Sequence, residues 1–187
     1  MIENNVASDL VSGTVEANKS SNEALSAKGR FTVECFDKDG NLKWKEENDN
    51  LVVNVGLQDM NTKYFSGSSY TAAWYIGLYG SGSTNNPAAG DTMSSHAGWT
   101  EVTAYSQATR PAAVFGTAST ANPSVISNSA SVAVFSINGT TTVGGAFLTS
   151  NNTKGGTTGT LFSASDFQTG DRAVISGDTL NVTFQLS

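Results

Sequence analysis

A lone histidine and the polar side chains around it are the group of residues in this sequence that most resembles a hydrolase site. His96 is the sole imidazole of the chain, and Asp91, Ser94, Ser95 and Glu101 are close to it in sequence. A serine hydrolase requires a nucleophile, a base that accepts its proton and a carboxylate that orients the base. The residue types are present, but nearness in sequence does not establish that geometry.

The same residues also suit a structural role. Asp91 and Ser94 can satisfy the backbone groups of local turns, and His96 can pack beside Trp99. The carboxylates of Asp91 and Glu101 form a second catalytic alternative, but glycoside hydrolysis requires a separation of about 5 Å or about 6.5–9.5 Å, which a sequence cannot supply. We favour the structural interpretation and expect Asp91, His96 and Trp99 to make loop contacts in a protein without catalytic residues.

Metal binding is not favoured by the available ligands. One cysteine, Cys35, and one histidine, His96, cannot supply a four-ligand zinc site or an intrachain disulfide. The acidic turn from Asp37 to Asn41 resembles a calcium loop, but its glycine is fourth rather than sixth, and Asn48 occupies the position of the final acidic ligand. We therefore expect no metal and no cofactor.

Composition and charge narrow the classes of partner. The 187 residues, enough for one domain, carry a net charge of −6 with a pI near 4.6. Such a chain repels phosphate backbones on average, and no cluster of lysine and arginine offers a local exception. The sequence also contains neither a signal peptide nor an apolar run of about 18 residues. We expect no nucleic-acid partner, no membrane span and no secretion signal.

The composition favours short strands joined by tight turns, because 19 glycines accompany only 3 prolines and 14% of the residues are charged. Alternating apolar residues predict a β-hairpin over residues 30–46. Apolar residues at helical spacing from Val53 to Tyr64 predict a helix over residues 50–65, with its apolar stripe packed against a sheet. Gly56 weakens that helix by about 1 kcal/mol relative to alanine.

Residues 72–187 have the pattern of a β-sandwich. The run from Ala72 to Tyr79 predicts an inner strand with bulky side chains on both faces. Short strands separated by turn residues are typical of a sandwich or barrel. They are predicted at about 111–117, 131–137, 142–149, 159–162, 172–175 and 178–186. The expected fold class is mainly β, a single antiparallel sandwich of jelly-roll or Greek-key type with one helix and an extended N-terminal arm.

Residues 1–29 form the predicted arm, which precedes a β-rich domain over residues 30–187. Its isolated apolar residues are too few to bury a core of their own, so we expect them to bind a partner. The proposed contact residues are Ile2, Val6, Leu10, Val11 and Val15. The partner is a neighbouring copy of the chain or an underlying protein shell, and the alternative is that the arm rests on its own domain.

A set of short motifs is spread over about residues 30–187 and does not include the arm. The motifs are Asn50 to Leu57, Ala73 to Leu78, Asp91 to Met93, His96 to Glu101, Tyr105, Arg110-Pro111, Asn128 to Ser131, Gly145 to Leu148, Lys154 to Leu161 and Ser176 to Leu180. Together they resemble a family of small virion proteins of tailed bacteriophages.

The resemblance implies a decoration or cement protein, made in the host bacterial cytoplasm and bound in many copies to the capsid exterior of the virion. It would bind the major capsid protein and stabilise the head, and no catalytic residues come with it. We expect a homo-oligomer, a trimer, because symmetric assembly protects open sheet edges. The alternative is a tail or fibre component with a carbohydrate- or receptor-binding face, on which Tyr75, Tyr79, Trp99 and Tyr105 would stack against sugars.

Overall fold

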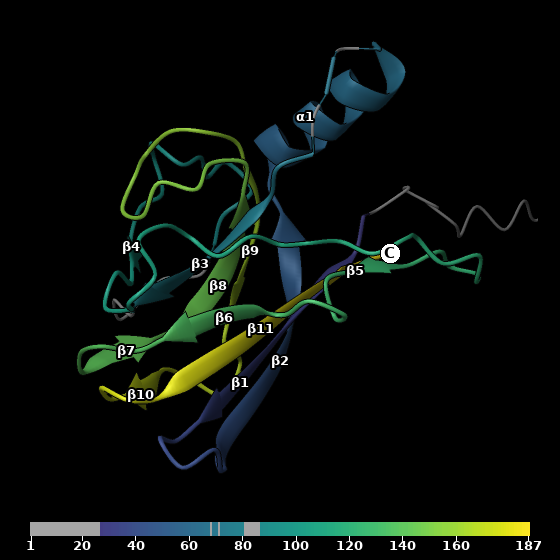
Figure 1. Cartoon of the computed structure of the whole chain (residues 1–187). Helices are drawn as coiled ribbons and strands as arrows, with labels where there is room; N and C mark the ends of the chain where they lie inside the picture. Colours follow the sequence, from purple (N-terminus) through teal and green to yellow (C-terminus); the bar gives the residue numbers. More distant parts are fainter. Residues whose placement is uncertain (1–26, 68, 71, 81–86) are drawn as a thin grey trace, which may run out of the picture.

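The computed structural model of the chain describes residues 27–67, 69–70, 72–80 and 87–187. In this part of the chain the fold is mainly β, with a large antiparallel sheet, a small two-stranded sheet and one helix (Figure 1). The mainly β class and the helix were both predicted. The arm residues proposed to bind a partner, Ile2, Val6, Leu10, Val11 and Val15, lie outside the described residues.

Eleven strands and one helix follow one another along the described part of the chain. They are β1 (Gly29–Phe36), β2 (Leu42–Val52), α1 (Asn54–Phe65), β3 (Tyr75–Gly80), β4 (Thr100–Glu101), β5 (Ile126–Ser127), β6 (Ala133–Ser136), β7 (Thr141–Val143), β8 (Gly145–Thr149), β9 (Leu161–Asp166), β10 (Arg172–Val174) and β11 (Thr179–Leu186).

Strand β2 joins two groups of strands into the large sheet. The strand order is β4-β3-β8-β9-β2-β1-β11-β5, and β6 also pairs with β11. Residues from Leu42 to Asn50 of β2 pair with β1, whereas Leu51 and Val52 pair with β9. Figure 1 shows β2 running from the tip of the hairpin to the base of α1. One continuous strand therefore belongs to both groups.

The main core lies between these two groups of strands. Alternate residues of each strand point to the same face of a sheet, so each group contributes one row of apolar side chains. Buried members from β1 and β11 pack in the same cluster as buried members from β3 and β8. They are Phe31, Val33, Cys35, Leu180, Val182, Phe184, Ile76, Leu78, Ala146 and Leu148. The bent sheet thus encloses a single main core.

A second, smaller core covers the other face of β3 and β8. The ring of Phe147 lies over Gly77, where a Cβ would be only 2.1 Å from the ring, and the ring of Tyr79 lies over Gly145 in the same way. Trp99, from the loop before β4, packs on both rings at centroid distances of 5.1 and 5.2 Å. Strand β3 is therefore buried on both faces, as predicted for an inner strand.

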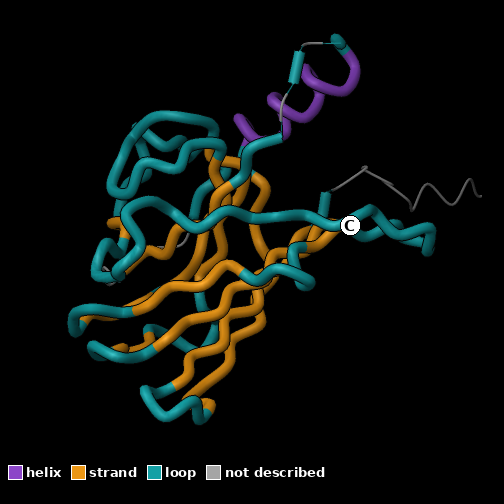
Figure 2. The backbone as a smooth tube through the Cα atoms, in the orientation of Figure 1, coloured by secondary structure: helices purple, strands orange, loops and turns teal. Residues whose placement is uncertain are grey.

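The helix differs from its prediction at its start and in its packing. It begins at Asn54 rather than at residue 50, because the chain continues β2 as far as Val52. The apolar stripe is core only in its first part, as Val53 is buried in the second core and Met60 packs against the main core. Its last two residues are not core as predicted, since Tyr64 and Phe65 are 80% and 74% exposed. Figure 2 shows the reason, because α1 extends away from the strands after its first turn.

Two of the predicted strands also differ. The stretch 142–149 is divided at Gly144 into β7 and β8, which belong to different sheets. The stretch 111–117 forms no strand, and Ala112 makes an isolated bridge to Tyr75 instead. The hairpin predicted at 30–46 is present, but its second strand runs six residues further because it must reach β9.

We predict that Gly56→Ala destabilises the fold although alanine favours helices by about 1 kcal/mol. A Cβ at Gly56 would lie 2.3 Å from the carbonyl oxygen of Phe162 in β9, so the helix would have to move away from the sheet. We expect urea unfolding to show a loss of about 1–3 kcal/mol.

The matched control is Thr62→Ala, at an exposed position of the same helix. We expect its free energy of unfolding to change by less than about 0.5 kcal/mol. If Gly56→Ala were instead as stable as the parent chain, the close approach of α1 to β9 would be wrong.

Candidate functional site

The histidine loop is held together by contacts among its own residues. The ring of His96 stacks on Trp99 with centroids 3.8 Å apart, and His96 Nδ1 lies 3.0 Å from the Trp99 carbonyl oxygen. The indole N–H of Trp99 donates to Asp91 Oδ2 at 3.2 Å, and the Ala88 amide donates to the same oxygen at 3.0 Å. The predicted packing of His96 beside Trp99 is confirmed.

The hydroxyl groups near His96 are also paired locally. Thr92 Oγ1 and Ser94 Oγ lie 3.2 Å apart, and the Ser95 amide donates to Thr92 Oγ1 at 3.0 Å. Within the described part of the chain, no hydrogen bond joins the His96 ring to a serine hydroxyl. The geometry of this loop favours its structural interpretation, in which Asp91 and Trp99 close the loop over the second core.

Glu101, the other carboxylate considered for catalysis, belongs to a different network. Its two oxygens accept from Arg110, with Nε–Oε1 and Nη2–Oε2 distances of 2.8 and 2.7 Å. The Gly155 amide also donates to Glu101 Oε2 at 2.8 Å. Because Asp91 and Glu101 each have separate structural partners, they do not form an open pair of carboxylates for glycoside hydrolysis.

Arg110 is a buried cation, and the sequence named it only within the motif Arg110-Pro111, without a structural role. Its guanidinium group also donates to the carbonyl oxygens of Asn151 and Gly156, at 2.8 and 2.7 Å, and lies over the Phe147 ring at 5.3 Å. Its side chain has no solvent-exposed surface. One arginine thus connects the loop after β8 to β4 and to the second core. These contacts suit a guanidinium group, which is planar and has several N–H donors.

We predict that Arg110→Ala destabilises the chain by about 3–5 kcal/mol, because it leaves the Glu101 carboxylate buried without its partner. The control is Lys45→Ala, which removes an exposed ion pair with Glu47 at 2.8 Å. We expect that control to change the free energy of unfolding by less than about 1 kcal/mol. Urea unfolding compares the two, and equal effects would contradict a structural role for Arg110.

The single thiol is enclosed in the main core. Cys35 is fully buried on β1, and burial raises the pKa of its thiol to about 11, with the Asp178 carboxylate acting in the same direction. The reactive form of cysteine is the thiolate. Both access and ionisation are therefore suppressed near neutral pH.

We predict that the Cys35 thiol does not react with Ellman's reagent near neutral pH while the chain is folded. Because the pKa is raised, the neutral thiol is the folded form below about pH 11, and the thiolate appears only when unfolding restores the lower pKa. Addition of urea should release one reactive thiol per chain. Prompt reaction without urea would show that β1 is accessible.

The acidic turn considered for calcium is closed by its own hydrogen bonds. Asp37 Oδ1 accepts from the backbone amides of Asp39 and Asn41 at 2.9 Å each, and the Asn41 side chain donates to Oδ2 at 3.0 Å. These bonds from Asn41 lower the pKa of the Asp37 carboxyl. Among the residues that the structure describes, no group of three potential metal ligands is gathered.

Most of the aromatic residues expected on a sugar-binding face are not exposed. Tyr79, Trp99 and Tyr105 are buried, and Tyr75 is half-buried. A planar ring stacks on a sugar only if its face is open to solvent. The prediction that these side chains form an exposed carbohydrate-binding face is therefore wrong, since three of them pack in the two cores instead.

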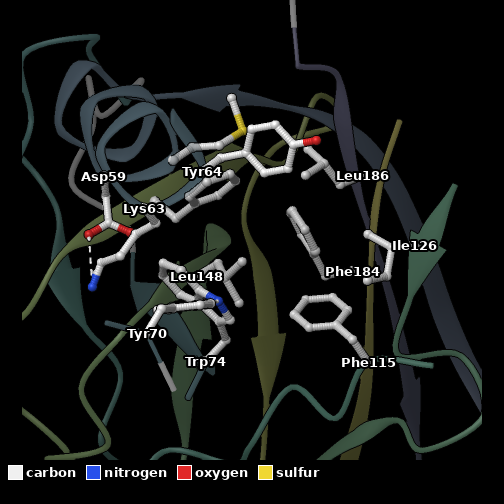
Figure 3. Close-up of a pocket in the computed structure, with 12 residues that line it drawn as sticks. Asp59, Lys63, Tyr64, Tyr70, Trp74, Phe115, Ile126, Leu148, Phe184 and Leu186 are labelled. Atoms are coloured by element: carbon white, nitrogen blue, oxygen red, sulfur yellow. Dashed lines mark hydrogen bonds and ion pairs between the residues drawn. The ribbon is translucent and has the colours of Figure 1, made fainter. Parts of the chain in front are cut away.

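An apolar groove opens between α1 and the end of the sheet. Its volume is about 320 Å3. In Figure 3, Ile126, Phe184 and Leu186 form one side, while Asp59 and Lys63 of α1 stand on the other. The remaining lining residues are Met60, Tyr64, Tyr70, Trp74, Phe115, Leu148 and Phe162. The floor belongs to the main core, so this groove is where that core reaches the surface.

The wall of the groove next to α1 is built from interacting aromatic and charged side chains. The Trp74 indole N–H donates to the Tyr70 hydroxyl oxygen at 2.5 Å, and the Lys63 ammonium lies 4.9 Å from the centre of the Tyr70 ring. Asp59 and Lys63 form an ion pair at 3.9 Å. The polar groups of this wall are thus directed at one another, which leaves the groove mainly apolar.

The aromatic tip, formed by Tyr64 and Phe65 at the end of α1, is the most exposed pair of large apolar side chains in the described residues. Their rings meet edge to face with centroids 4.9 Å apart. Tyr64 lines the groove, so the aromatic tip and the groove form one continuous apolar surface. Large contiguous apolar surface is typical of sites that bind proteins or ligands.

Comparisons of this chain with protein-family models, with curated proteins and with solved structures found no match. The helix in the described residues is too short and too polar to cross a membrane.

Sequence reasoning missed the groove and the aromatic tip because it assigned the helical stripe to the core. The available signal was the pair of aromatic residues at the end of that stripe, followed directly by Ser66 and Gly67. Bulky residues in the last turn of a helix have no following turn of that helix to cover them. Arg110 gave no comparable signal, because its burial depends on a loop that is distant in sequence.

Proposed function

We propose that this chain is a structural protein of a tailed-bacteriophage virion that decorates the exterior of the head by binding the major capsid protein. The motif resemblance over residues 30–187 supports this class of protein. The observation that carries the proposal is the aromatic tip, Tyr64 and Phe65, which α1 holds away from the sheet. The histidine loop and the carboxylates, engaged in structural contacts, favour a protein without catalytic activity.

The energetics of the aromatic tip suit attachment to another protein. Burying a large aromatic side chain contributes about 1.5–3 kcal/mol, and aromatic residues are enriched among those that dominate binding energy. A single tip would give modest affinity, but many copies on one capsid would act together if the copies were linked. Such avidity would suit a protein that stabilises a head in many copies.

The oligomeric state stays a proposal, with a trimer as the preferred form. Few open edges of the large sheet need protection, because its edge strands are short: β4 and β5 have two residues each, and β6, which also pairs with β11, has four. Short edge strands leave few unpaired backbone groups. Closed symmetry is common among homo-oligomers in general, and the trimer is proposed as one such closed form.

The finer description of the fold and its domains is likewise proposed. A sandwich of jelly-roll or Greek-key type is supported by the single core between the two groups of strands. The proposed division is an N-terminal arm over residues 1–29 and one β-rich domain over residues 30–187. Because β1 and β2 pair directly with β11 and β9, the hairpin and the later strands act as one folding unit.

The alternative function is a tail or fibre component with a receptor-binding face. Burial of Tyr79, Trp99 and Tyr105 removes most of the residues on which its carbohydrate-binding form depended. Particles that lack the protein separate the two functions. Unstable heads that are restored by added protein support decoration, whereas stable heads with lost adsorption to the host support a fibre component.

We predict that a Tyr64→Ser, Phe65→Ser double variant binds purified heads at least about tenfold more weakly than the parent chain, since a loss of 1.4 kcal/mol corresponds to that factor. Leu42→Ser is the matched control, because Leu42 is also exposed, at 54%, but lies at the hairpin end of β2, away from α1. Co-sedimentation with heads lacking the native protein measures binding. Parent-like binding by the double variant would rule out this docking surface.

A further inference from the structure

The groove beside α1 leaves apolar side chains of the main core open to an occupant. Leu148, Phe162 and Phe184 are core residues that also line the groove, and Met60 and Trp74 complete its apolar surface. Leaving such surface in water costs roughly 25 cal/mol per Å2. The groove thus favours an apolar peptide segment rather than a polar ligand.

The described part of the chain begins at the rim of this groove. The backbone amide of Lys28 donates to the Ser187 carbonyl oxygen at 2.9 Å, and the reverse bond is 2.8 Å. Gly29 is paired in register with Leu186, whose side chain lines the groove (Figure 3). Any segment that precedes Ala27 therefore leaves the sheet next to the groove.

The segment that precedes Ala27 has 26 residues and carries apolar side chains at regular intervals. Ile2, Val6 and Leu10 are four residues apart, as are Val11 and Val15. Residues at such spacing share one face of a helix. Even at about 1.5 Å per residue, a helix of 15 residues spans roughly 22 Å, so the segment is long enough to lie along a groove of this size.

We propose that the N-terminal arm of this chain docks in the groove of its own domain, with the apolar face that includes Leu10, Val11 and Val15 against α1 and the sheet. The arm joins the folded domain at the groove's rim, so the effective concentration of the tethered segment is of millimolar order, far above that of a second chain in dilute solution. This inference goes beyond the proposed function and does not rest on it, because the free protein can hold its arm in the groove whether or not it binds a capsid.

Limited trypsin digestion of the full chain tests the docking, because Lys19 is the single lysine or arginine among residues 1–26. We expect cleavage after Lys19 to be about tenfold faster in Met60→Asp, which places a charge in the groove, than in the parent chain. Gln58→Asp, which adds the same charge at an exposed position of α1 outside the groove, should be cut at the parent rate.

A second pair of variants leaves the folded domain untouched. Val11→Asp removes an apolar side chain from the arm and should speed cleavage after Lys19 by a similar factor, whereas Ser12→Asp adds the charge at the neighbouring polar position and should not. Both positions are remote from the scissile bond. Equal cleavage rates for Val11→Asp, Ser12→Asp and the parent chain would overturn the proposal.

The same digestions distinguish docking within one chain from exchange between copies. Protection that is independent of protein concentration, in a chain that elutes as a monomer, supports docking in the chain's own groove. The other outcome is protection that increases with protein concentration, in a chain that forms an oligomer and in which Val11→Asp abolishes that oligomer. This outcome would assign the groove to the arm of a second copy and overturn the proposal as stated. Head binding by Val11→Asp, measured separately, reports on the proposed function alone.

Discussion

The double pairing of β2 is the constraint on which the rest of the structure depends. A strand that pairs with β1 over most of its length and with β9 at its end forces the sheet to bend, and the bend brings two apolar faces together. It also fixes where the helix starts, because α1 follows β2 after a single residue and touches β9 at Gly56. The helix then leaves the sheet at an angle that opens the groove beneath it.

A different interaction organises the face opposite the main core. Long loops such as those before β4 and after β8 have no ladder of their own, so their backbone groups need partners from elsewhere. Arg110 supplies donors to two carbonyl groups and to Glu101, and Asp91 supplies an acceptor to Trp99. Charged residues in these loops thus replace the missing secondary structure, which explains why residues with catalytic potential are engaged as parts of the scaffold.

Patterns in the sequence predicted those features of the fold that depend on residues close together in the chain. The alternation of apolar and polar residues was sufficient to predict β1 and β11, because their buried residues recur at every second position. Bulky side chains on both faces were sufficient to predict β3 as an inner strand. The same reasoning failed for the end of α1, since a stripe shows that a helix has an apolar face and not that the domain covers it along its whole length. It also failed for Trp99 and Tyr105, whose burial is set by loops that return from distant positions.

The pairing of Lys28 with Ser187 brings both ends of the described chain to one side of the molecule, while the turn from Asp37 to Asn41 lies at the far tip of the hairpin (Figure 1). The two sites differ as places for attaching cargo. A tag joined after Ser187 would emerge beside the groove and obstruct it, whereas a peptide inserted in the hairpin turn would point away. The hairpin turn is therefore the better point at which to insert a foreign peptide for surface display on this protein.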